Sequence, residues 1–231
     1  MTASPAPRSS KADLRVSTGL SFAAGFVDTA TFIALFGLFT AHVTGNFVLI
    51  GAELVASSTE GVLAKLLALP AFIAAVAAAR LIALALERRG IAPLRWLLTL
   101  EAVMLAAFCA AGVAGSPFAS ADGLAAILTG MLGVLAMGVQ NAVARLSLSH
   151  LAQTTVMTGN VTQAVIDTVD LLRGALPEGS PARGRLGRMM PAIAAFAAGA
   201  VAGAFGVAVL SFWCLLLPVA LLAALAASEG A

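Results

Sequence analysis

The sequence predicts an all-α polytopic membrane protein that contains an internal duplication. The predicted fold has two inverted halves of three membrane spans each, and each half adds one re-entrant helix that carries the tripeptide Thr-Gly-Asn. The chain is 61% hydrophobic and 10% charged, whereas a soluble domain carries roughly 25% charged residues. Several apolar runs reach the ~20 residues that a helix needs to cross a bilayer. The tripeptide Thr-Gly-Asn occurs twice in similar surroundings.

Six apolar runs have the length of a membrane span, and they lie at 16–38, 66–86, 96–114, 123–144, 189–208 and 209–228. The last two form one uncharged stretch, which as a helix would be roughly 60 Å long and would cross twice. We therefore expect a turn between Gly206 and Trp213. Residues 1–15 are polar and basic and are expected to form a disordered tail. The first membrane repeat is predicted at 16–115 and the second at 121–228.

The same features follow one another in both halves of the chain, which favours a duplication. In the first and second half respectively, these are the segments GFVDTA (25–30) and GVQNAV (138–143), the tripeptides that begin at Thr44 and Thr158, the acids Glu53 and Asp167, and the segments FIAAVAAAR (72–80) and FAAGAVAGA (196–204).

Two of these regions resemble a known family. The stretches GFVDTATFIALFGLFTAHVTGNFVLIG and MGVQNAVARLSLSHLAQTTVMTGNVTQ are similar to the signature segments of the YoaK family, a group of uncharacterised bacterial inner-membrane proteins with a domain of unknown function. The resemblance covers nearly the whole chain and implies a bacterial inner-membrane location, but no activity. Where a glycine-rich third helix is expected, the first half has Ala75 and Ala79, whereas the second half keeps Gly199 and Gly203.

Basic residues favour one of two topologies, because cytoplasmic loops collect Lys and Arg. If both Thr-Gly-Asn segments crossed the membrane, the chain would have eight spans in parallel halves, and Arg145 and the basic residues of 88–95 would lie outside. If instead each segment returns to the face from which it enters, six spans remain, and Lys65 is the one loop cation placed outside. We therefore predict re-entrant segments and a cytoplasmic N-terminus, with spanning Thr-Gly-Asn helices as the alternative.

The two tripeptides are predicted to start re-entrant half-helices, with Thr44 or Asn46 as the cap of the first. Irregular backbone is tolerated at membrane depth only where it is buried in protein or lines a wet cavity. The residues concerned are Thr44, Gly45 and Asn46 in the first half and Thr158, Gly159 and Asn160 in the second. The alternative is that they serve only close helix packing and hydrogen bonds between helices.

Polar residues at membrane depth are the candidates for a solute or ion pathway. Asp28 lies about 20 Å along a helix from Arg15, near the middle of the bilayer, where a charge is costly. Its counterparts Gln140 and Asn141 are neutral. With Asp28, the acids of the half-helices, Glu53 and Asp167, are interpreted as proton or cation sites. The alternatives are a buried structural pair for Asp28 and water-exposed positions for the other two.

Other polar residues receive structural interpretations. Arg80 and Glu101 are predicted to lie at one depth on antiparallel helices and to form a structural ion pair, unless Arg80 extends to the membrane surface. His42 and His150 have no Cys, His or Asp at metal-ligand spacing, so we expect no metal. His42 adjoins a tripeptide and could join a proton path, although a loop histidine is the simpler interpretation. The sequence contains no cofactor or nucleophile motif, so no cofactor is expected.

The leading functional prediction is a small-solute transporter or channel with a polar pathway at the interface of the two repeats, coupled to protons. The alternatives are a packing or partner subunit without transport and, with less support, a membrane-embedded enzyme. The expected partners are the lipid bilayer and an unidentified small solute or proton, with a homo-oligomer left open. No nucleic-acid signature is present.

Overall fold

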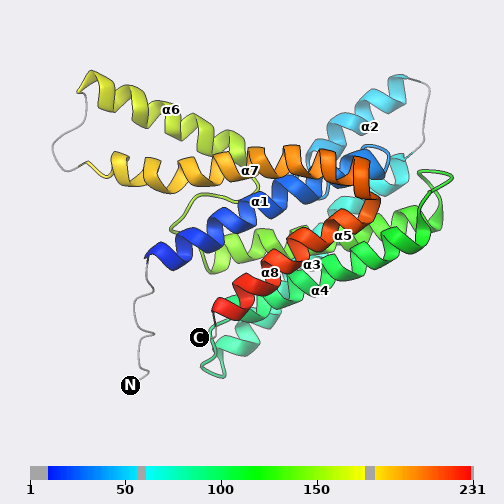
Figure 1. The fold of residues 1–231 in the computed structure, drawn as a ribbon, viewed down its shortest axis with the longest axis horizontal. Coiled ribbons are helices and arrows are strands. Elements are labelled where there is room, and N and C mark those ends of the chain that lie inside the picture. Colours follow the sequence, from blue (N-terminus) through cyan, green and yellow to red (C-terminus); the bar gives the residue numbers. More distant parts are fainter. Residues whose placement is uncertain (1–9, 57–60, 175–179, 230–231) are drawn as a thin grey trace.

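Helices dominate the chain because a helix satisfies all its backbone hydrogen bonds internally, as a membrane segment must. The computed structural model describes residues 10–56, 61–174 and 180–229 (Figure 1). In this part of the chain the elements are α1 (Ser10–Ala34), α2 (Gly45–Val55), α3 (Val62–Glu87), α4 (Leu94–Gly115), α5 (Leu124–Leu146), α6 (Met157–Arg173), α7 (Ala182–Leu210), the 3₁₀ helix η1 (Ser211–Leu215) and α8 (Leu216–Ser228). The predicted all-helical membrane fold is confirmed at this level.

Five stretches are long and apolar enough to cross a membrane, judged by length and composition, and they are Lys11–Ala34, Val62–Glu87, Leu94–Gly115, Leu124–Leu146 and Ala182–Ser228. The last stretch comprises α7, η1 and α8. The chain reverses there at Ser211 (φ 50°), inside the predicted turn, so that α8 runs back past α7 (Figure 1). Because α1 begins at Ser10, it includes the end of the predicted tail, whose residues 1–9 lie outside the described residues.

The closest helix contact joins α1 and α7. A Cβ placed on Gly199 would lie 2.1 Å from the carbonyl oxygen of Phe22, and one on Gly203 would lie 2.3 Å from that of Phe26. Gly25 faces α7 in the same way, since a Cβ placed on it would lie 2.2 Å from the carbonyl oxygen of Phe196. These three positions therefore require glycine, because the two backbones touch.

A related contact joins α5 to α3, where a Cβ on Gly138 would lie 2.6 Å from that of Ala75. The α4 helix packs against both α5 and α8. The two short helices lie at opposite ends of the molecule. Both begin near the middle of its long axis, and α2 runs outward to one end while α6 runs outward to the other (Figure 1). Their first residues, which include the Thr-Gly-Asn tripeptides, therefore lie toward the centre.

Candidate functional site

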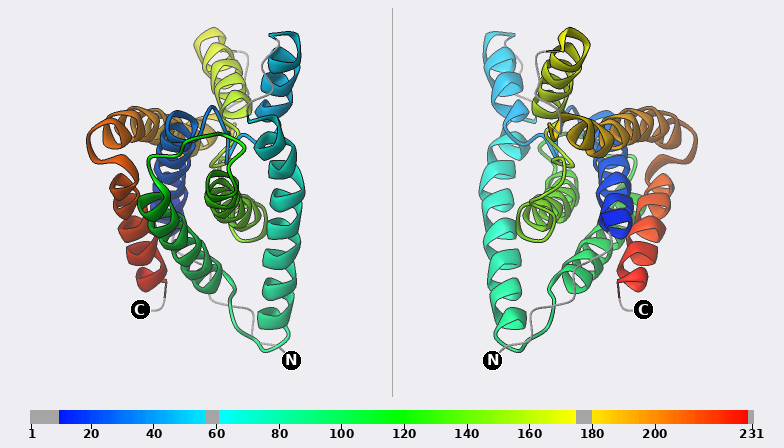
Figure 2. Two further views of the ribbon diagram at one scale, coloured as in Figure 1. Left: turned by 90° about the vertical axis from the view of Figure 1, so that its right-hand side faces the viewer. Right: turned by 90° about the vertical axis from the view of Figure 1, so that its left-hand side faces the viewer.

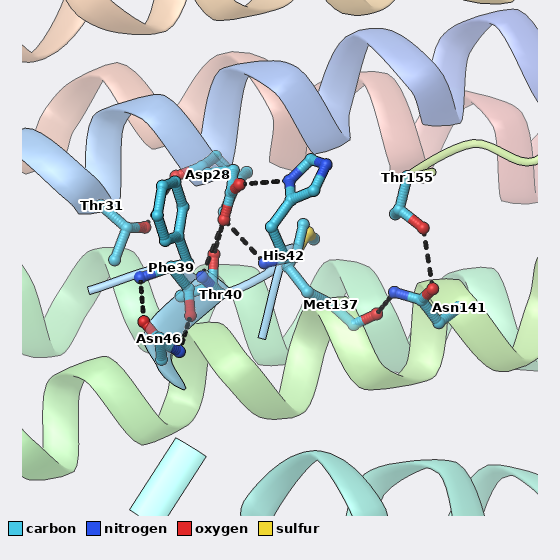
Figure 3. Close-up of polar contacts among 11 residues, drawn as sticks. Asp28, Thr31, Phe39, Thr40, His42, Asn46, Met137, Asn141 and Thr155 are labelled. Carbon is cyan, nitrogen blue, oxygen red and sulfur yellow. Dashed lines mark hydrogen bonds and ion pairs between the residues drawn. The ribbon is translucent and has the colours of Figure 1, made fainter. Parts of the chain in front are cut away.

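The polar centre of the molecule forms where the chain leaves α1 and folds back along it. Phe36 (φ 53°) and Gly37 (φ 78°) have left-handed backbone conformations, which reverse the chain after the helix. The segment 38–42 then lies beside the last turns of α1. The backbone N–H groups of Thr40 and Ala41 each donate to Oδ1 of Asp28 at 2.7 Å (Figure 3). Asp28 thus holds the break in the helical path in place.

The second oxygen of Asp28 contacts a histidine. Oδ2 lies 2.7 Å from Nδ1 of His42 (Figure 3). The Asp28 side chain is 6% exposed, whereas that of His42 is 39% exposed. His42 lies outside the helices long enough to span, and its hydrogen bond to Asp28 raises its pKa although burial acts against this. A buried carboxylate is thereby connected to an accessible imidazole.

The corresponding residues of α5 are neutral and make neutral contacts. Thr155 donates from its hydroxyl to Oδ1 of Asn141 at 2.8 Å (Figure 3). Nε2 of Gln140 donates to the carbonyl of Leu20 at 2.9 Å and lies 3.2 Å from the hydroxyl of Thr154. Gln140 therefore links α5 to α1 and to the segment that precedes α6.

The asparagines of the two tripeptides close the loops before the short helices. The side chain of Asn46 accepts from the N–H of Phe39 at 3.0 Å and donates to its carbonyl at 2.9 Å. Asn160 likewise donates to the carbonyl of Gln153 at 2.7 Å. The amide group suits this role because it carries both a donor and an acceptor, and so can pair with a backbone segment as another backbone would.

The predicted cap of α2 falls on Thr44 by position, but neither Thr44 nor Asn46 caps the helix through its side chain. Thr44 precedes α2 but makes no side-chain capping bond, and the amide of Asn46 is already bound to Phe39. The α6 helix begins at Met157, one residue before the second tripeptide. Thr44 and Thr158 are both exposed. The tripeptides therefore shape the approach to each helix through their asparagines.

The acids of the short helices each pair with a basic residue of the following helix. Glu53 of α2 lies 2.8 Å from Nζ of Lys65, whose side chain is 1% exposed. Asp167 of α6 accepts from Nε of Arg185 at 2.9 Å and from its Nη2 at 2.5 Å. The Arg185 hydrogen bonds lower the pKa of Asp167, with a smaller contribution from Gln163. Both acids are thus charge partners that fasten the short helices.

The predicted ion pair between Arg80 and Glu101 is wrong. Arg80 instead lies 3.3 Å from Glu87 on its own helix. Glu101 is fully buried, and neither of its carboxylate oxygens has a hydrogen-bond partner among the described residues. The two residues do not meet because α3 and α4 diverge from their turn with α5 between them (Figure 2). Equal depth on neighbouring helices was not sufficient to place them together.

Comparison with protein families identifies the chain at the family level. A family model described as "Protein of unknown function (DUF1275)" matches residues 16–228. The chain belongs to the DUF1275 family. This confirms the predicted membership of an uncharacterised family. The comparisons with curated proteins and with solved structures found no match.

Several functional residues of this DUF1275 protein were not identified as such from the sequence. Lys65 had been assigned to an outer loop, but it lies in α3 and is buried. Asp13, at the start of α1, lies 3.0 Å from Nε2 of His150. The Asp28–His42 contact depends on the reversal at Phe36 and Gly37. The glycine at 37 was the one available signal, since it permits a left-handed turn directly after an apolar run.

Proposed function

We propose that this DUF1275 protein is a proton-coupled transporter of a small solute in the bacterial inner membrane, with its N-terminus in the cytoplasm. The observation that carries the proposal is the contact between Asp28 and His42. A carboxylate buried in a membrane-length helix is costly unless it serves a pathway or a pair. Here it is joined to a half-exposed imidazole at a break in the helical path, an arrangement suited to accepting and releasing a proton.

The proposal includes the predicted inverted repeat, because inverted halves with interrupted helices are a pattern of secondary transporters. Helix α1 packs on α7, and its counterpart α5 packs on α3, which is the counterpart of α7. A Cβ placed on Gly25 would lie 2.2 Å from the carbonyl oxygen of Phe196, and one placed on Gly138 would lie 3.3 Å from that of Phe72. The outward, opposite courses of α2 and α6 (Figure 1) agree with two re-entrant helices that enter from opposite faces.

The topology can be tested by cysteine labelling in intact cells. Cys109 and Cys214 are buried and can be replaced by Ala to give a cysteine-free background. Single cysteines at Ala56, at the end of α2, and at Leu172, near the end of α6, report on the two short helices. We expect a membrane-impermeant maleimide to label position 56 from outside, and position 172 only after lysis.

A third cysteine at Gly90, in the turn between α3 and α4, is expected to react only after lysis. Labelling of position 90 from outside, together with protection of position 56, would indicate that α2 crosses the membrane. The halves would then be parallel, and the support from inversion would be lost.

Transport can be tested in proteoliposomes that contain the pH dye pyranine. Gradients of amino acids, carboxylates, amines and sugars are applied one at a time, and lumenal pH and uptake of the labelled solute are recorded. We expect at least one solute to move together with protons, and Asp28→Asn to abolish the coupled movement. Glu87→Gln, at an exposed acid, is the control and should retain it. If the wild-type protein moves neither solute nor protons, the transport proposal fails.

One observation favours a packing or partner subunit without transport. Asn46 and Asn160 both use their side chains to close loops within the chain. If this is their whole role, Asn46→Ala and Asn160→Ala should alter assembly or stability, while no solute flux exists to be altered. The proteoliposome measurement on the wild-type protein therefore also distinguishes this alternative.

A further inference from the structure

A cavity of about 270 Å³ with several polar lining residues lies between α6, α7 and the segment that precedes α6. Arg185 and Arg188 of α7 line one side, and Gln163 and Gly159 of α6 line another. Gln153 contributes from the preceding segment. Among the described residues that line the cavity, none has an acidic side chain. The cavity therefore presents donors and positive charge, which is the chemistry of an anion site.

The corresponding place in the first half is filled. Phe39 and Gln153 hold the same relation to the asparagines, since each bonds through its backbone to the asparagine of its own tripeptide. A Cβ on Gly45 would lie 3.1 Å from the ring of Phe39, whereas one on Gly159 would find nothing within 4 Å. The first half thus has Phe39 at this position, packed close to Gly45. The second half has Gln153 there, and the space beside Gly159 is open.

One cation at this cavity has no counter-ion within residues 10–56, 61–174 and 180–229. Arg185 is paired with Asp167, but Arg188 forms no ion pair with any residue of the described ranges. The N–H groups of Thr158 and Gly159, in the first turn of α6, likewise find no hydrogen-bond acceptor in the described parts of the chain. The positive end of the α6 dipole adds to the charge of Arg188. Gly159 and Arg188 both line the cavity, so this amide and this guanidinium lie at one space.

We propose that this cavity binds a phosphate group. A guanidinium presents a fork of donors that matches the oxygens of a phosphate, and helix amides bind the same group. Both arginines lie in the first turns of α7, just before its uncharged stretch begins at Met189, and the cavity extends from them toward the first turn of α6 near the centre of the molecule (Figure 1). The group could come from an anionic phospholipid or from a soluble phosphate compound. The proposal does not depend on transport.

The test measures phosphate binding by the full-length protein in two settings. Native mass spectrometry compares retention of phosphatidylglycerol with that of phosphatidylcholine. Titration with inorganic phosphate or glycerol phosphate in phosphatidylcholine nanodiscs, followed by thermal shift, examines the soluble source. We expect one of the two probes to bind, and Arg188→Gln to weaken that binding about tenfold, through loss of a charge-assisted hydrogen bond.

A second variant and a control make the result decisive. Gln153→Phe introduces the residue type that the first half has at the corresponding position, Phe39. The larger ring should close the cavity without removing a charge, so this variant should also abolish binding. Arg183→Gln lowers the charge of the same helix by the same amount, but Arg183 does not line the cavity, and binding should be retained. Equal losses in Arg183→Gln and Arg188→Gln, retained binding in both cavity variants, or no binding of either probe by the wild-type protein would overturn the proposal.

Discussion

Replacing Asp28 by Ala is expected to destabilise the folded protein by about 3–5 kcal/mol, because buried N–H groups that lose their acceptor cost about 1–3 kcal/mol each. The N–H groups of Thr40 and Ala41 both donate to Oδ1 of Asp28. Both residues are buried, so water does not readily replace the lost acceptor. The loss of the His42 contact adds less, since that ring is 39% exposed. The measurement is the thermal stability of the purified protein in detergent.

The variant Asp28→Asn separates the contribution of Asp28 to folding from the contribution of its negative charge. Its amide oxygen can still accept from Thr40 and Ala41, and its amide nitrogen can donate to an unprotonated Nδ1 of His42. Stability should therefore stay close to that of the wild type, while proton coupling is lost. Thr31→Val is the matched control, because the Thr31 hydroxyl bonds only to the Val27 carbonyl of its own helix in the contacts described. If Asp28→Ala is as stable as this control, Asp28 does not hold the segment 38–42.

The second large effect is expected from Gly199→Ala, which should destabilise the protein by at least the ~1–3 kcal/mol typical of overpacked cores. The new Cβ would lie 2.1 Å from the carbonyl oxygen of Phe22, and Gly203→Ala would place one 2.3 Å from that of Phe26. The obstacle is backbone in both cases, so a change of rotamer cannot relieve it. Helices α1 and α7 would have to move apart. The effect is measured by heating samples to increasing temperatures and determining, by size-exclusion chromatography, how much folded protein remains.

The control for this prediction lies on the same helix. A Cβ on Gly187 would find nothing within 4 Å, so Gly187→Ala should leave stability unchanged or raise it by up to about 1 kcal/mol through helix propensity. A similar loss in Gly187→Ala and Gly199→Ala would mean that the effect comes from α7 itself. The close approach of α1 and α7 would then not explain the requirement for glycine.

The helices could be predicted from the sequence because apolar length is a local property. The runs at 66–86 and 96–114 fall inside observed helices, the run at 123–144 begins one residue before α5, and the reversal at Ser211 falls inside the predicted turn. The positions of Asp28, Glu53 and Asp167 on helices also followed from the local pattern. What their side chains contact did not, because each partner lies on another part of the chain.

The failed predictions share a physical cause. Depth along a helix follows from counting residues, but the direction in which a side chain points depends on how helices are arranged around one another. Arg80 and Glu101 were matched by depth, whereas α5 lies between their helices. Lys65 was treated as a loop cation because the predicted span began at residue 66, whereas it lies in α3 and pairs with Glu53 of α2. The reversal that brings His42 to Asp28 is likewise a tertiary event.

The contact between α1 and α7 has a mechanical consequence. Residues 16–115 and 121–228 are continuous in sequence, yet the tightest packing joins a helix of one to a helix of the other, and α3 with α5 repeats this exchange. Backbones in direct contact cannot slide apart without losing that packing. We therefore expect α1 to move together with α7, and α3 to move together with α5. A rocking motion would then occur between the α1–α7 pair and the α3–α5 pair. Helix α2 contacts α3 and helix α6 contacts α7, so each short helix would move with a different pair.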